Sequence, residues 1–179
     1  MLKVDGDPAF LKRQVLPYRQ REGVLKALPK IERDGISASV VLSTWATSAV
    51  VAMKSYGQAL RTSGDYRLTL NPCLRRSAAT KVKPEDHGQC MLYSKLSSEV
   101  DSVDVYLQIP LHLESKPLTT ITTLWGMFQY SLLLSGLHES RGVFQAAIDE
   151  TISDIEGVVA YQHDVLISGH MRDEHAHGF

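Results

Sequence analysis

Residues 157–169 read GVVAYQHDVLISG, and this stretch decides the fold. Two apolar segments, Val158–Tyr161 and Asp164–Ile167, flank the polar pair Gln162-His163, a pattern that predicts two strands joined by a two-residue turn. A buried carboxylate without a partner is costly in free energy, so an acid between two apolar strands persists where a cation or a hydrogen-bond donor meets it. The commoner role of an acid at a strand end is a solvated turn residue, so Asp164 needs further support.

A second acid, Asp101, stands just before Val103–Ile109 (VDVYLQI). This segment alternates with a period of two and stops at Pro110, which predicts a strand that starts near Asp101. Two acids at adjacent strand ends can share a hard divalent cation. Asp101 and Asp164 are therefore candidate metal ligands.

The first half of the chain predicts one helix and several short strands. Residues 19–34 place apolar side chains on one helical face, and Pro29 within this stretch should kink or end the helix. Residues 38–53 are rich in Val and Ala and predict strand pieces around Trp45. Residues 66–70 alternate as a strand would.

The second half predicts a hairpin followed by a helix. Leu118–Thr123 and Met127–Leu132 flank a turn at Trp125-Gly126. Ser140 can cap a helix that Gly157 closes. Because strands and helices mix without strict alternation, the sequence predicts an α+β fold.

Composition excludes several classes of protein. The chain has 179 residues, of which 44% are hydrophobic and 22% charged, as in ordinary globular domains. It has no apolar run as long as a membrane span requires and no signal-peptide core near residue 1, so we predict an intracellular protein, cytoplasmic or nuclear, with no membrane partner. Cys73 and Cys90 have no metal-binding spacing. The oligomeric state stays open.

Charge divides unevenly between the two halves. Residues 1–89 hold 15 Lys and Arg against 8 Asp and Glu, whereas residues 90–179 hold 4 against 12. A basic half could hold phosphates while an acidic half holds cations, although chance clustering of surface charge gives the same pattern.

Segments along most of the chain resemble the fingers and palm of gypsy-type LTR-retrotransposon reverse transcriptases. The family's Tyr-x-Asp-Asp hairpin is matched by Tyr161-Gln162-His163-Asp164. Other palm matches are Val103–Leu111, Leu118–Tyr130, Gly136, Phe144-Gln145 and Asp173-Glu174-His175. Fingers matches are Ser43-Thr44-Trp45-Ala46, Lys54, Gly57, Arg61 and Gly64-Asp65-Tyr66-Arg67.

This resemblance implies a right-hand polymerase fold with an antiparallel palm sheet backed by helices. It implies a basic fingers-like subdomain at residues 1–89 and an acidic palm-like subdomain at residues 90–179, with the metal-site hairpin at residues 158–167. The sequence ends at Phe179, so we expect no thumb, connection or RNase H, and a poor grip on primer–template.

The activity implied by the resemblance is RNA-directed DNA synthesis on a template–primer from dNTPs, with two Mg²⁺ ions. Carried over position by position, Asp101 and Asp164 become catalytic metal ligands. Tyr106 takes the place of the steric gate against a ribose 2′ hydroxyl. Arg61 and Lys54 take the place of the fingers cations that contact the incoming triphosphate.

One position departs from the family in a way that bears on catalysis. His163 replaces the first aspartate of the hairpin pair, which removes a negative charge and offers nitrogen where magnesium prefers oxygen. Mn²⁺ tolerates a nitrogen ligand better. The family's Phe-Ser-Lys-Leu-Asp also resembles residues 93–97, an alignment that puts Ser97 instead of Asp101 in the first catalytic place.

Three functions remain open from the sequence. The chain is a degenerate polymerase, an active one that uses Mn²⁺, or a non-catalytic module that binds RNA or DNA through its basic half. A metal site among the C-terminal histidines is less expected than a solvated tail. Trp45 and Trp125 could stack bases, although packing in the core or a hairpin is commoner.

Overall fold

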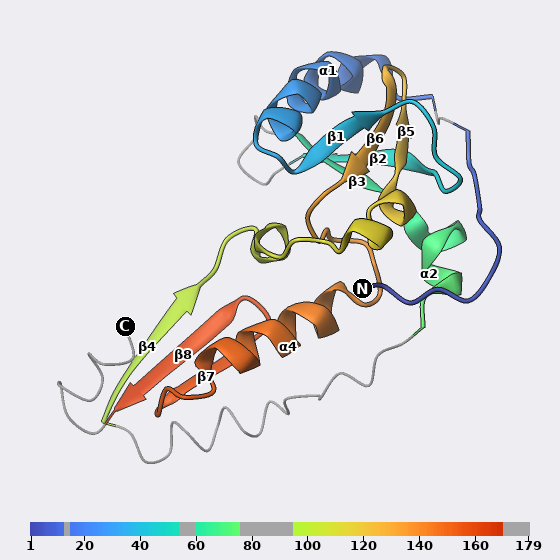
Figure 1. Cartoon of the computed structure of the whole chain (residues 1–179). Coiled ribbons are helices and arrows are strands. Elements are labelled where there is room, and N and C mark those ends of the chain that lie inside the picture. Colours follow the sequence, from blue (N-terminus) through green and yellow to red (C-terminus); the bar gives the residue numbers. More distant parts are fainter. Residues whose placement is uncertain (13–14, 54–59, 76–94, 170–179) are drawn as a thin grey trace. The chain divides into compact units, whose positions relative to one another are not determined.

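The structure, a computed structural model, describes residues 1–12, 15–53, 60–75 and 95–169 (Figure 1). The chain forms two compact units, each built from two segments: Met1–Arg76 with Tyr106–Ser140, and Ser77–Val105 with Arg141–Phe179. Each unit combines helices with a sheet, which confirms the predicted α+β class. The assignment of fingers-like and palm-like subdomains on either side of residue 89 stays a prediction.

The first unit contains a five-stranded sheet with the order β1-β6-β5-β2-β3. Only β2 and β5 run parallel, and the other neighbours are antiparallel. Helix α1 packs against β1 and β3 of this sheet. The strand bounds are β1 Ser37–Val40, β2 Thr47–Met53, β3 Leu60–Gly64, β5 Ile121–Thr123 and β6 Gly126–Tyr130.

The predicted hairpin around Trp125 is confirmed as β5 and β6. The Thr123 hydroxyl donates to the carbonyl of Gly126 at 2.8 Å and accepts from the Trp125 N–H at 3.1 Å. Gly126 has φ +126°, a conformation that favours glycine. These contacts close the turn locally.

Helix α1 spans Tyr18–Arg33 and runs through Pro29. The expectation that Pro29 could end the helix is wrong, because the helix continues for another turn to the left-handed Gly35 at φ +70°. Val24 and Leu28 are fully buried on its inner face. Their packing holds the helix together where proline removes a backbone hydrogen bond.

The predicted strand at residues 66–70 is wrong, because the segment forms the 3₁₀ helix η1 (Tyr66–Leu68) and the start of α2 (Leu70–Cys73). The Asp65 carboxylate accepts the N–H of Arg67 and opens this turn. The buried Tyr66 hydroxyl donates to the carbonyl of Thr119 at 2.8 Å. Side-chain hydrogen bonds of this kind compete with strand pairing.

The second unit contains an antiparallel three-stranded sheet with the order β4-β8-β7 and the helix α4. Figure 1 shows α4 beside this sheet. The predicted hairpin from residue 158 is confirmed, and so is a helix that begins at Ser140. The predicted helix end at Gly157 is wrong, because α4 ends at Ile152, and the Ser140 hydroxyl donates to the Leu134 carbonyl instead of capping the helix. The bounds are β4 Leu96–Asp101, α4 Ser140–Ile152, β7 Val158–Tyr161 and β8 Asp164–Gly169.

The predicted strand Val103–Ile109 is wrong, because this segment is a turn followed by the 3₁₀ helix η2 (Val105–Gln108). The strand lies before Asp101 instead of after it. Every residue of β8 pairs with a residue of β4. No residue of β8 is therefore left to pair with residues 103–109 on that side. Two further 3₁₀ helices, η3 (Leu113–Ser115) and η4 (Pro117–Thr119), lead into β5. No helix among the described residues has the length and apolarity of a membrane span.

Candidate metal centre

Strand register brings the two predicted acids together. Asp101 is the last residue of β4, Asp164 is the first of β8, and the two are direct partners in the antiparallel ladder. Directly opposite residues share one face of a sheet, with Cβ atoms about 4.5–5.5 Å apart. The alternative candidate Ser97 pairs with Ser168, further along the strands. The register therefore puts Asp101, and not Ser97, opposite Asp164.

His163 completes this cluster from the two-residue turn between β7 and β8. One potential ligand atom from each of Asp101, His163 and Asp164 lies within 4.8 Å of the other two. The backbone N–H of Ser102 donates to the His163 carbonyl at 2.8 Å, which ties the turn to the end of β4. We call these three residues the Asp-His-Asp cluster. Asp101 and His163 are exposed and Asp164 is half-buried, so the side chains can adjust around an ion.

A buried glutamine on α4 holds the same turn. The Gln145 side chain is only 7% exposed. Its amide nitrogen donates to the Ala160 carbonyl at 2.9 Å, and its amide oxygen accepts the Gln162 N–H at 2.9 Å. Gln162 has φ +56°, which is an uncommon conformation for a residue with a side chain. Gln145 therefore fixes the backbone that carries His163.

The sequence analysis includes Gln145 in the Phe144-Gln145 pair that resembles the palm of the family, but it predicts no role for this residue. The only local signal is a polar residue beside the apolar stripe of α4, directly after the buried Phe144. Its partners lie 15 and 17 residues away on another element, so the hydrogen bonds appear only in the folded chain.

The described residues provide no ion-pair partner for either carboxylate of the Asp-His-Asp cluster. Three ion pairs of the described residues lie in the first unit, between Lys26 and Glu22, Arg67 and Asp65, and Arg75 and Asp5. Two carboxylates that share one face repel each other, and a bound cation would offset this repulsion.

The other predicted site residues belong to the first unit. Arg61 lies in β3 opposite Ala52, and the half-buried Tyr106 lies in η2. Lys54 lies outside the described residues. Trp45 is a core residue at 6% exposure, while Trp125 is 38% exposed in the β5–β6 turn. The structure thus brings together the predicted metal ligands and His163.

Sequence comparisons find relatives that are much longer than this chain. No family model matches the chain. It is 29% identical over 173 residues to "Uncharacterized protein K02A2.6" of Caenorhabditis elegans, covering 94% of this chain. It is 32% identical over 81 residues, or 44% of this chain, to the "Enzymatic polyprotein" of Cestrum yellow leaf curling virus. The chain spans 13% of the length of each of these relatives.

Solved structures give the fold. Prototype foamy virus protease–reverse transcriptase matches 98% of this chain with a TM-score of 0.83 and 20% identity, over 24% of its own length. The chain has a reverse-transcriptase fold. The foamy viral enzyme in complex with an RNA/DNA hybrid matches 97% of this chain with a TM-score of 0.79 and 17% identity, over 23% of its own length.

The donor set of the cluster does not fit the pair of magnesium ions that a polymerase of this fold implies. Two carboxylates and one imidazole supply two negative charges for two dications. Mg²⁺ also prefers oxygen to nitrogen ligands and demands near-octahedral geometry. The cluster therefore departs from a paired-magnesium centre in both charge and ligand chemistry.

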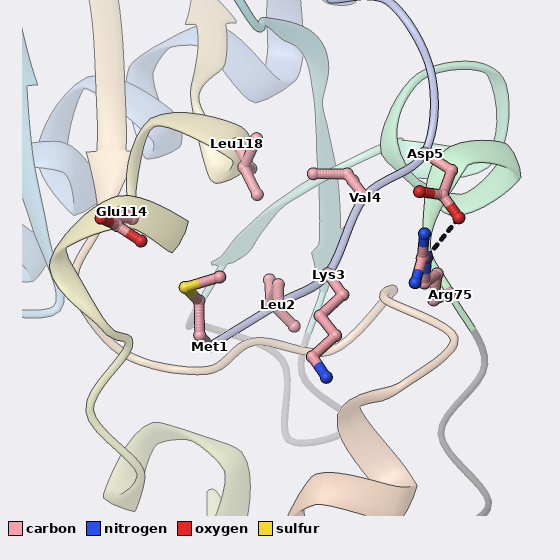
Figure 2. A pocket seen from close by; sticks show the side chains of 8 residues that line it. All are labelled: Met1, Leu2, Lys3, Val4, Asp5, Arg75, Glu114 and Leu118. Carbon is pink, nitrogen blue, oxygen red and sulfur yellow. Dashed lines mark hydrogen bonds and ion pairs between the residues drawn. The ribbon is translucent and has the colours of Figure 1, made fainter.

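The first unit contains a separate pocket of about 430 Å³. Figure 2 shows the mixed apolar and charged side chains that line it, among them the ion pair between Arg75 and Asp5. The hydrogen bond from Arg75 holds the pKa of the Asp5 carboxyl below its usual range. The residues of the Asp-His-Asp cluster take no part in this pocket.

Proposed function

We propose that this chain is the fingers-and-palm part of a gypsy-type RNA-directed DNA polymerase whose nucleotidyl transfer is impaired at His163. The observation that carries the proposal is the meeting of Asp101, His163 and Asp164 at one end of the three-stranded sheet, in a reverse-transcriptase fold. Template-directed synthesis needs carboxylates at this point to organise metal ions and the primer hydroxyl. The chain supplies two of them and one imidazole.

The proposal assigns roles to residues outside the cluster. Arg61 and Lys54 would offset the charge of the incoming triphosphate, and Tyr106 would contact its sugar. RNA or DNA template–primer and dNTP are the partners. In support, the foamy viral enzyme has been solved in complex with ds DNA and with an RNA/DNA hybrid.

Impairment follows from the chemistry of the replacement. A neutral imidazole in place of a carboxylate lowers the negative charge that holds two dications close together. Loss of one member of a concerted catalytic unit commonly costs about 10³-fold or more in rate. His163→Asp, which restores that charge, should therefore raise the rate by about this factor.

The test is single-nucleotide incorporation under single-turnover conditions, with the full chain in excess over an RNA-templated DNA primer. Excess protein removes the need for a tight grip on the primer. We expect His163→Asp to incorporate about 10³-fold faster than the natural sequence with Mg²⁺. A double variant that adds Asp164→Ala should lose this gain, since both changes act on one site.

Two outcomes would contradict the proposal. Equal rates for the natural sequence and His163→Asp would show that His163 does not impair transfer. Absence of incorporation by both, although primer–template binds in the same tubes, would show that the cluster is not a polymerase site.

A second candidate function is non-catalytic binding of RNA or DNA. The first unit contains 14 Lys and Arg against 8 Asp and Glu, whereas the second contains 5 against 12. The excess of positive charge in the first unit favours contacts with phosphates. Such binding should weaken steeply as salt rises, because bound phosphates release counterions. Affinity that is independent of salt, or no binding at 50 mM salt, would count against it.

A further inference from the structure

The disagreement between the Asp-His-Asp cluster and a magnesium pair points to a different ion. We propose that Asp101, His163 and Asp164 form a single-ion site for a borderline transition-metal dication, with Zn²⁺ as the representative ion. The proposal concerns the same residues as the proposed function, but it requires no catalysis. The experiment that tests the proposal measures metal binding alone.

The ligand chemistry selects this class of ion. Zn²⁺ takes imidazole nitrogen and carboxylate oxygen together, and its open sites commonly have three protein ligands with water in the remaining position. Imidazole also suits the neighbouring metals Co²⁺ and Ni²⁺, whereas Mg²⁺ is served by oxygen ligands. Two carboxylates bring two negative charges, which match a single dication.

The spacing suits one ion. Ligands at about 2.0–2.2 Å from a tetrahedral metal lie roughly 3.4 Å from one another. The three ligand atoms are within 4.8 Å of each other, so small side-chain rotations bring them to that spacing. The exposed position of Asp101 and His163 leaves room for those rotations and for a water ligand.

The backbone beneath the three ligands is fixed. Asp101 and Asp164 are direct partners in the ladder, and the Ser102 N–H holds the His163 carbonyl at 2.8 Å. Gln145 holds the Gln162 N–H from the other side of the turn at 2.9 Å. Ligands on a fixed backbone lose less conformational freedom when the ion binds, which favours affinity.

The test is a titration of the full chain with Zn²⁺, and separately with Mg²⁺, by isothermal calorimetry with a competing chelator. His163→Ala should weaken the strongest zinc site by at least about 100-fold, because even loss of an outer partner of a metal ligand costs about 10–100-fold. His138→Ala is the matched control, since His138 is exposed and lies in the first unit. It should leave the isotherm unchanged.

A reciprocal variant tests the choice between metals. His163→Asp keeps the turn but changes the third ligand to oxygen, and it should lower the ratio of zinc to magnesium affinity by at least about tenfold. An unchanged ratio, or a zinc site that survives His163→Ala intact, would overturn the proposal. Circular dichroism of each variant confirms that the chain is folded. These results do not depend on polymerase activity, so the proposal can fail or succeed separately from the proposed function.

Discussion

Among single residues, Gln145 has a larger structural role than its position on a helix suggests. Its buried amide makes hydrogen bonds to the Ala160 carbonyl in β7 and to the N–H of Gln162, which lies in the left-handed region. Removing it leaves the buried Ala160 carbonyl and the half-buried Gln162 N–H without their partner. An unsatisfied buried polar group costs about 1–3 kcal/mol.

We therefore predict that Gln145→Met, which keeps the volume but loses the hydrogen bonds, lowers the free energy of unfolding by roughly 1–3 kcal/mol. The turn should also loosen, so hydrogen exchange at the Gln162 amide should accelerate and metal affinity should fall about 10–100-fold. Glu150→Met is the control, because Glu150 is exposed on the same helix. Loss of stability without any change in metal affinity would mean that Gln145 supports only the fold.

The sequence identifies the three residues of the Asp-His-Asp cluster, but it predicts the strand beside Asp101 on the wrong side of that residue. The sequence correctly puts His163 in the two-residue turn and Asp164 at the start of the next strand, because the apolar segments around the turn are short and clearly bounded. Asp101 was chosen for a strand that follows it, yet it ends the strand that precedes it. Exposed positions dominate β4, so this strand has no apolar alternation by which the sequence could reveal it.

At the scale of elements, the β7–β8 hairpin depends on the backbone conformation of Gly157, the residue before β7. Gly157 precedes β7 with φ +77°, and its carbonyl accepts the Ser168 N–H at 2.8 Å. A Cβ at this position would lie 2.3 Å from the Ser168 carbonyl oxygen, which belongs to the backbone and cannot rotate away. A side chain here meets both an unfavourable backbone conformation and a clash.

Gly157→Ala should consequently destabilise the chain by roughly 2–3 kcal/mol, which combines the left-handed conformation with the displacement of β8. Gly35→Ala provides a matched control: φ is +70°, but nothing lies within 4 Å of the added Cβ. It should cost about 1–2 kcal/mol from the conformation alone. Denaturant unfolding followed by circular dichroism measures both. Equal losses would mean that the hairpin adapts to the added methyl group.

Elements with strong local signals were predicted, and those fixed by tertiary contacts were not. The hairpins at Trp125 and at Gln162-His163 follow from turn residues between apolar segments. Residues 66–70 alternate like a strand, but the burial of Tyr66 and its bond to Thr119 turn them into 3₁₀ and α-helix. That bond joins residues 53 positions apart, and no local pattern encodes it.

On the scale of the whole molecule, each compact unit is assembled from two distant segments. Residues 121–130 add β5 and β6 to the sheet that β1 and β2 begin, so a single boundary cannot separate the two units. Composition along the chain does not reveal that each unit takes a segment from both halves of the sequence. The charge asymmetry nevertheless persists between the units, because residues 106–140 carry few charges.

The first unit also contains two buried tyrosines that make the stability of the molecule depend on pH. Burial raises the pKa of the Tyr66 hydroxyl well above its usual value, with a further contribution from Tyr130, and burial likewise raises the pKa of Tyr130. Both hydroxyls donate to backbone carbonyls, of Thr119 and of Thr62. In the unfolded chain these groups lose their protons at a pH of about 10. In the folded chain they keep them, so their stabilising contribution is complete below about pH 10 and is lost as the pH rises further.

Unfolding of the first unit should therefore become easier between pH 9 and 11, by up to about 1.4 kcal/mol per pH unit for each tyrosine. Tryptophan fluorescence reports on this unit alone, because the chain has 2 tryptophans and both Trp45 and Trp125 belong to it. The midpoint of urea unfolding measures the effect. The double variant Tyr66→Phe/Tyr130→Phe should be less stable at pH 8, since it loses two hydrogen bonds, but its midpoint should fall much less from pH 9 to 11. If the natural sequence and the double variant lost stability in parallel, other groups would be responsible for the alkaline effect.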